Sequence, residues 1–335
     1  MMHRSDQSSE QSREYKELPG SRYHVPGYVR LFHQGLLAER ARILEQALSS
    51  CALCPRRCGV NRNRGEVGAC GVNSLPKVAA VSTHHWEEPP ISGKEGSGTI
   101  FFSGCTLKCI YCQNYPISQM GVGRYLSVEE LAAAMLRLQR RGAHNINLVT
   151  ATHQMPAVVR ALCIAAPQGL NIPLVYNSSG YENTQMLPLL EGIVDIYLPD
   201  IKYDDAAAAK WCSQREDYIE HNRAALIEMW RQVGPLQLDE YGVAFRGLLV
   251  RHLVLPDNLS GTRNCLSFLA NELGPDVWVS LMSQYFPAYK AVDLHPLNRK
   301  VTEHEYRDAF QALLDLGLDH GYTQDSCKRG NGTGL

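Results

Sequence analysis

Six predicted strands, each followed by a predicted helix, constrain the fold of this 335-residue chain more than any other feature. The predicted strands cover residues 98–103, 145–150, 172–177, 193–198, 247–255 and 277–283. The predicted helices cover residues 127–141, 154–165, 182–191, 218–232, 263–273 and 303–316. Repeated alternation of this kind is typical of an α/β protein with a parallel sheet. Right-handed crossovers should bring all six strand C-termini to one rim, where such folds build their sites.

Three cysteines follow the first of these strands. Cys105, Cys109 and Cys112 have the spacing C-x3-C-x2-C, which allows a short loop to direct three thiolates toward one centre. Cysteine thiolates are the usual ligands of iron–sulfur clusters, and a full protein set is four. A four-iron cluster held by these three cysteines would leave one iron open to a non-protein ligand. The alternatives are a zinc or structural iron–sulfur knuckle, or three unrelated buried cysteines.

A second cysteine group precedes the strand–helix repeat. Seven of the eleven cysteines fall in two groups, and the second group comprises Cys51, Cys54, Cys58 and Cys70. Clustered short spacings in a reducing compartment indicate metal binding more often than disulfides. Four thiolates suit either structural zinc or a cluster ligated only by protein. We favour a second cluster, because the neighbouring segment already implies iron–sulfur chemistry.

Composition narrows the class of protein further. A net charge of −1 argues against a strongly basic nucleic-acid binder. The sequence has no apolar run long enough to span a membrane, and its polar N-terminus has no signal-peptide core, so a cytoplasmic protein is expected. Residues 1–20 have almost no apolar content and are predicted to form a disordered tail. Residues 30–48 carry a leucine stripe that predicts one helix.

The central cysteine motif, with Tyr111 just before its last cysteine, resembles that of the radical S-adenosylmethionine superfamily. Together with residues 147–153, 199–202 and 282–289, it is similar to the uncharacterised iron–sulfur branch related to pyruvate formate-lyase activating enzyme. The resemblance implies an α/β fold: a partial (β/α)6 TIM-like barrel with an N-terminal cysteine-rich metal-binding extension. The implied boundaries are residues 1–20 for the tail, 21–76 for the extension, 77–320 for the core and 321–335 for a C-terminal tail.

The resemblance also implies an activity. In this superfamily S-adenosylmethionine binds the open iron of a 4Fe–4S cluster, and one electron splits it to give a 5′-deoxyadenosyl radical that abstracts hydrogen. In the activases the hydrogen comes from a glycine of a partner enzyme. The implied partners are therefore S-adenosylmethionine, a one-electron reductant such as flavodoxin or ferredoxin, and, for an activase, a glycyl radical enzyme. The alternatives are a radical enzyme acting on a small molecule or another peptide, and a non-catalytic iron–sulfur or zinc electron-transfer protein.

Candidate cofactor-binding residues lie at the ends of the predicted strands. By resemblance to the activases, Asn177 helps to hold the cofactor, Lys202 pairs with its carboxylate, and Asp200 either orients it or lines the substrate pocket. Alternation along an extended strand places Asp200 and Lys202 on one face. Arg251 either binds the cofactor carboxylate or pairs with Asp200 inside the barrel. Solvated rim charges, and an ordinary turn at Asn177, are the alternatives.

Another group of candidates replaces a motif that this sequence lacks. Thr150, Thr152 and His153 stand where the superfamily usually carries a Gly-Gly-Glu-like segment that binds the amino group of the cofactor. They offer hydroxyl and imidazole groups but no carboxylate. The alternative for Thr152 is an N-cap of the helix that begins near Gln154. At the last strand, Gln284 and Tyr285 are candidates for substrate contact.

Overall fold

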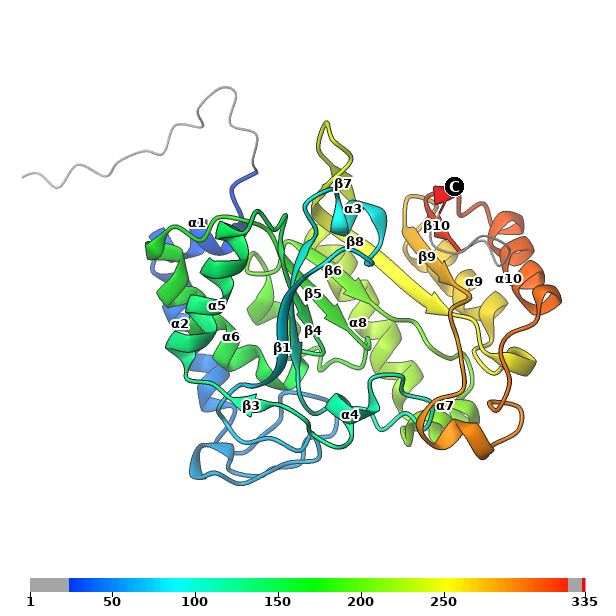
Figure 1. Ribbon diagram of the computed structural model, residues 1–335, viewed down its shortest axis with the longest axis horizontal. Coiled ribbons are helices and arrows are strands. Elements are labelled where there is room, and N and C mark those ends of the chain that lie inside the picture. Colours follow the sequence, from blue (N-terminus) through cyan, green and yellow to red (C-terminus); the bar gives the residue numbers. More distant parts are fainter. Residues whose placement is uncertain (1–23, 325–332, 335) are drawn as a thin grey trace, which may run out of the picture.

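A largely parallel sheet with helices packed against it forms the centre of the computed structural model, which describes residues 24–324 and 333–334 (Figure 1). The sheet has the strand order β11-β10-β9-β8-β6-β5-β4-β2-β1-β3, with β7 paired to β8. The parallel strands are β2 (Ser97–Phe102), β4 (Ile146–Val149), β5 (Leu174–Ser178), β6 (Ile196–Pro199), β8 (Ala244–Leu253), β9 (Trp278–Met282) and β10 (Gly321–Thr323). All six predicted strands are confirmed, and β10 adds a seventh from the region expected to be a tail.

Antiparallel strands cover both edges of the parallel sheet. β1 (Lys77–His84) pairs with β2 and with the short β3 (Arg124–Tyr125) at one edge, and β11 (Thr333–Gly334) pairs with β10 at the other. β7 (Gln237–Leu238) pairs with the first part of β8. This mixed α/β architecture is consistent with a partial barrel, because an open sheet with one direction of crossover places the strand C-termini along one rim.

The helices agree with the predicted repeat at most positions. The long helices are α1 (Gly27–His33), α2 (Leu36–Gln46), α5 (Val128–Arg140), α6 (Met155–Ala165), α7 (Ala206–Ser213), α8 (Tyr218–Val233), α9 (Thr262–Glu272) and α10 (Glu303–Asp315). Single turns form α3 (Pro89–Ser92) and α4 (Tyr115–Ser118). The predicted capping box at α5 is present: Ser127 Oγ accepts from the Glu130 N–H, and the Glu130 carboxylate accepts from the Ser127 N–H.

Two helix predictions are wrong. The helix expected over residues 30–48 is divided into α1 and α2 at Gly35, whose φ of +75° belongs to the left-handed region. The helix expected over residues 182–191 is irregular apart from a 3-10 turn at Leu187–Leu190. There the Asn183 side chain accepts from the Gln185 N–H and donates to a carbonyl of the cysteine-rich extension, so local side-chain hydrogen bonds replace helical ones.

The core is divided between the body of the sheet and the surroundings of the cysteine loop. The larger part packs apolar side chains of the sheet and the helices together. The smaller part is rich in tyrosine and surrounds residues 107–111. In the part of the chain that the structure describes, no helix has the length and apolar character to cross a membrane. The tail expected at residues 1–20 lies outside the described residues.

Candidate functional site

The three-cysteine loop begins where β2 ends, at the C-terminal rim of the sheet. Gly104 makes the turn into the loop with a φ of +82°, and a Cβ at this position would collide with the carbonyl oxygen of Cys70. Glycine is therefore required both by the backbone conformation and by the close approach of the second cysteine group. Further along the loop, the Ile110 N–H donates to the Cys212 carbonyl at 2.8 Å, which ties the loop to the end of α7.

The thiols of Cys105, Cys109 and Cys112 lie close enough together for their charges to interact. Burial, together with the smaller effect of the neighbouring Cys109 and Cys112, raises the pKa of Cys105 to about 12. Hydroxyl groups lie against two of the sulfurs: Ser213 Oγ is 3.0 Å from Cys109 Sγ, and Ser118 Oγ is 3.1 Å from Cys112 Sγ. Such contacts are able to stabilise thiolates once a metal displaces the thiol protons.

No group of three or more His, Cys, Asp or Glu side chains converges on a single ion position within residues 24–324. A 4Fe–4S cluster does not require such convergence, because each thiolate binds a different iron. Three adjacent thiols on one loop, two of them with hydroxyl neighbours, therefore fit the ligand set of a cluster with one iron left open.

The four cysteines of the N-terminal extension are also neighbours, in the segment between α2 and β1. Cys54 interacts electrostatically with Cys51 and Cys70, and Cys70 interacts with Cys51 and Cys58. The buried Arg62 anchors this segment: its guanidinium donates to the Asn73 carbonyl at 2.7 Å and to the His153 carbonyl, at the end of β4, at 2.8 Å.

A network of charged side chains connects three neighbouring strand ends. The Asp200 carboxylate, just after β6, accepts from Lys202 Nζ at 2.6 Å and from Arg251 Nε, on β8, at 3.1 Å. Arg251 also donates to Asn177 Oδ1, on β5, at 2.6 Å. The side chains of Asp200, Lys202 and Arg251 are only 15–18% exposed. The structure thus brings four of the sequence-predicted residues together, and Arg251 forms the ion pair with Asp200 that was the alternative to cofactor binding.

The pKa shifts of Asp200 and Lys202 indicate that this network lies near the cysteine loop. Burial opposes charge on Asp200, but Lys202 and Arg251 outweigh it and hold the pKa of this carboxyl below its usual range. Burial likewise opposes charge on Lys202, but Asp200 and Cys109 raise its pKa above the ordinary value. The effect of Cys109 on this pKa means that the ammonium group lies near the cysteine loop.

Two residues of the network were missed by the sequence reasoning. Glu87, after β1, lies 3.6 Å from Arg251 Nη1 and accepts from Asn147 Nδ2, on β4, at 3.2 Å. Burial raises the pKa of Glu87 although Arg251 opposes the shift. The Asn147 Oδ1 atom is buried and has no hydrogen-bond partner among the described residues. No sequence pattern pointed to Glu87, because β1 lies outside the strand–helix repeat.

Thr150, Thr152 and His153 occupy a different part of the rim. Thr150 has a φ of +59° and donates its N–H to the Asn177 carbonyl at 2.9 Å, so its strained backbone adjoins the network. Thr152 donates to the buried Glu182 carboxylate at 2.8 Å, and α6 has no side-chain N-cap. The helix-cap alternative for Thr152 is therefore wrong.

His153 is buried against the residue that precedes the cysteine loop. Its Nε2 is 2.8 Å from the Ser103 carbonyl, whereas its buried Nδ1 has no hydrogen-bond partner among the described residues. Burial lowers the pKa of His153 to about 3, so the imidazole is neutral near pH 7. Together with Arg62, whose guanidinium binds the carbonyl of the same residue, it connects the two cysteine segments.

Buried tyrosines also pack around the cysteine loop. Tyr285 is buried and its ring meets that of Tyr111 edge-on, with centroids 6.0 Å apart. The Tyr111 and Tyr203 hydroxyls are 2.6 Å apart, and Tyr203 is 2.6 Å from Ser213 Oγ. A hydrogen-bonded chain therefore runs from Tyr111 to the serine that contacts Cys109. The Gln284 side chain accepts from Gln324 at 3.1 Å, and its backbone carbonyl accepts from Gln113 of the cysteine loop at 3.2 Å.

A largely parallel α/β sheet with a three-cysteine loop at its C-terminal rim is typical of a class of proteins that bind an iron–sulfur cluster. The chain belongs to the radical SAM superfamily, whose family model matches residues 99–234. It is 30% identical over 295 residues to the uncharacterized protein MJ0674 of Methanocaldococcus jannaschii, covering 85% of this chain and 80% of that protein. It is 24% identical over 270 residues to the uncharacterized protein MJ0808 of the same organism, covering 73% of each. Membership implies S-adenosylmethionine cleavage chemistry at a 4Fe–4S cluster.

Proposed function

We propose that this protein is a hydrogen-abstracting radical S-adenosylmethionine enzyme, with its cluster held by Cys105, Cys109 and Cys112. The observation that carries the proposal is the ionic network at the neighbouring strand ends, in which Lys202 bonds to Asp200 and lies near enough to Cys109 for their charges to interact. A cofactor bound to the open iron would meet these charges directly. When bound, the cluster and the cofactor supply a 5′-deoxyadenosyl radical, and the protein supplies position and electrostatics.

The network has the charges that the methionine part of the cofactor requires. That part carries a carboxylate and an ammonium group. Lys202 and Arg251 are cations suited to the carboxylate, while Asp200 and the Asn177 side-chain oxygen are acceptors suited to the ammonium. In this proposal Thr150 adjoins the cofactor through its contact with Asn177, whereas Thr152 and His153 support the rim from the interior through their contacts with Glu182 and Ser103.

We assign a second 4Fe–4S cluster, in preference to zinc, to Cys51, Cys54, Cys58 and Cys70. The support is proximity: the Cys70 carbonyl lies against Gly104, at the first turn of the three-cysteine loop. A second redox centre here would lie between that loop and an external one-electron reductant such as flavodoxin or ferredoxin. Structural zinc at the same cysteines is the alternative, and metal analysis distinguishes the two.

The hydrogen donor that we place first is a glycyl radical enzyme, because the motifs resemble those of the activases. A small molecule or another peptide is the second candidate. Adding a purified candidate substrate to a reduced enzyme should accelerate 5′-deoxyadenosine formation, because correct positioning of the donor is then complete.

The proposal is tested by anaerobic reconstitution with iron and sulfide, chemical reduction, and chromatographic measurement of methionine and 5′-deoxyadenosine. Both products are expected from the unmodified protein. Changing Cys105, Cys109 and Cys112 together to alanine should abolish both products and remove the iron of one cluster. Cys163→Ala is the matched control, because Cys163 is a half-buried residue of α6 that belongs to neither cysteine group. A reduced, iron-loaded protein that neither binds nor cleaves S-adenosylmethionine would leave the non-catalytic metal-protein alternative.

A further inference from the structure

The outer edge of β1 is a strand edge without a partner over most of its length. β1 pairs with β2 along residues 78–84, but on its other side β3 pairs only with Lys77 and Val78. Within residues 24–324, no other backbone group or side chain forms a hydrogen bond to the outer edge of residues 79–84. Alternate residues of such a strand direct their N–H and C=O groups outward, which makes the edge a template for a further strand.

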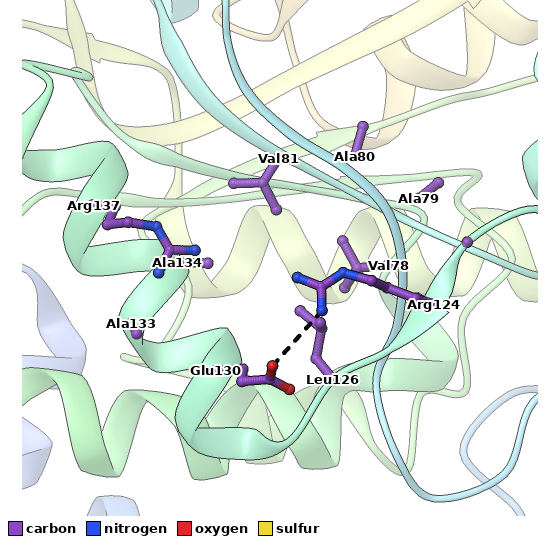
Figure 2. Close-up of a pocket in the computed structure, with 11 residues that line it drawn as sticks. Val78, Ala79, Ala80, Val81, Arg124, Leu126, Glu130, Ala133, Ala134 and Arg137 are labelled. Carbon is purple, nitrogen blue, oxygen red and sulfur yellow. Dashed lines mark ion pairs between the residues drawn. The ribbon is translucent and has the colours of Figure 1, made fainter.

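A groove runs along this edge, between β1 and α5 (Figure 2). It has a volume of about 520 Å³, within the range of ligand-binding pockets. Small and apolar side chains line it on both sides. The alanines on α5 have short side chains, which leave space between the helix and β1. These residues are Val78, Ala79, Ala80 and Val81 from β1, Leu126 after β3, and Ala133 and Ala134 from α5.

The side chains that line the groove carry a net positive charge. Arg124 and Glu130 approach each other to 3.7 Å across one end of the groove, as the dashed line in Figure 2 shows. Arg137 lines the other end, is exposed, and its guanidinium contacts no carboxylate among the described residues. The lining therefore contains two arginines and one glutamate, and an acidic group is the complementary ligand.

We propose that this groove binds an extended, acidic peptide segment of a partner protein by adding it to β1 as a further strand. The β1 edge would supply main-chain hydrogen bonds, the small side chains would accommodate alternate side chains of the segment, and Arg137 would bind its carboxylate. Main-chain pairing gives affinity for extended peptides in general, and the arginine provides the selectivity for an acidic one.

One end of the groove lies near the three-cysteine loop. Its Val78 end adjoins the rim, because the Ser103 N–H, just before the three-cysteine loop, donates to the Lys77 carbonyl at 2.8 Å. A partner docked along β1 would therefore have one end of its bound segment next to this loop. The peptide site itself requires neither the cluster nor the cofactor, so its test is independent of the proposed function.

The experiment measures peptide binding by fluorescence anisotropy and by hydrogen exchange. The probe is a fluorescein-labelled Thr-Val-Glu-Val-Thr peptide, and its twin carries lysine in place of glutamate. The acidic probe should bind more tightly than the twin, and it should slow exchange of the amides in residues 79–84. Arg137→Glu should weaken binding of the acidic probe at least about tenfold, the effect of losing one charge-assisted hydrogen bond. Arg140→Glu is the control, because Arg140 is exposed on the same helix outside the groove and should leave binding unchanged.

Other results would overturn the proposal. Equal binding of the two probes, or equal weakening by Arg137→Glu and Arg140→Glu, would show that no acidic segment is selected. Exchange protection of the outward-facing amides of residues 79–84 without peptide, rising with protein concentration, would identify a second copy of the chain as the occupant. The same protection persisting on dilution would identify a segment of the chain itself. Unchanged exchange at residues 79–84 with bound probe would locate the peptide elsewhere.

Discussion

Replacing Lys202 by methionine removes one charge from the ionic network and keeps most of the side-chain volume. The Lys202 side chain is 15% exposed and bonds to Asp200 at 2.6 Å, so its ammonium already has a fixed orientation. If it binds the cofactor carboxylate, Lys202→Met removes one charge-assisted hydrogen bond, worth about 1.5–3 kcal/mol. The dissociation constant of S-adenosylmethionine should therefore rise roughly ten- to a hundred-fold. Asp200 retains Arg251 as a partner, so the fold should survive.

The assay is equilibrium binding of S-adenosylmethionine to the reconstituted protein under anaerobic conditions, with iron and sulfide measured on the same samples. Iron content should not change, because Lys202 is not one of the proposed ligands of the cluster. Lys210→Met is the matched control: Lys210 lies on α7, pairs with Glu216 and is 66% exposed. An unchanged dissociation constant in Lys202→Met protein with full iron content would refute the assignment of Lys202 to the cofactor.

Three further predictions concern the support of the site. Gly104→Ala should lower the free energy of unfolding by about 2–5 kcal/mol in urea titrations, because the left-handed conformation is strained and the new Cβ meets the Cys70 carbonyl. Arg62→Met should cost about 2–4 kcal/mol in the same assay, because it leaves the buried His153 carbonyl and the half-buried Asn73 carbonyl without their donor. For Glu182, burial raises the pKa from an ordinary value near 4.5 to about 7, so its contribution to stability is present below pH 4.5 and is lost as the pH rises through 7. The stability difference between wild type and Glu182→Gln should therefore shift by about 3 kcal/mol against wild type between pH 4.5 and 7.5.

The sequence predicted the parallel strands well because these strands are buried on both faces and appear as short apolar runs. β5 and β6 are buried throughout, which explains why residues 172–177 and 193–198 could be recognised. β1 was missed because its burial alternates irregularly at a sheet edge, and the three-residue β10 is too short for any periodicity. Residues 182–191 had helical composition, but tertiary contacts of Glu182 and Asn183 determined their conformation.

The predicted strand ends also located part of the candidate site. Asn177, Asp200 and Arg251 lie at ends of neighbouring parallel strands, so correct strand assignments were enough to bring them together. Glu87 and Ser213 come from the segment after β1 and from the end of α7. Their contacts depend on how chain segments outside the repeat fold back onto the rim, and no periodicity in the sequence encodes that path.

The contacts around Asp200 explain how several charged side chains are tolerated in a largely buried position. Isolated charges in a protein interior are costly, and pairing offsets that cost only when geometry is good. Here one carboxylate contacts two cations, and Arg251 has two more partners in Asn177 and Glu87. The charged groups are therefore oriented before any cofactor arrives, and binding need not order flexible side chains. Glu87 pairs with Arg251 Nη1, whereas Asp200 pairs with Arg251 Nε. Burial raises the pKa of Glu87 to about 7, while Lys202 and Arg251 hold the pKa of Asp200 below its usual range, so the charge of Glu87 is the one of these two that changes near neutral pH.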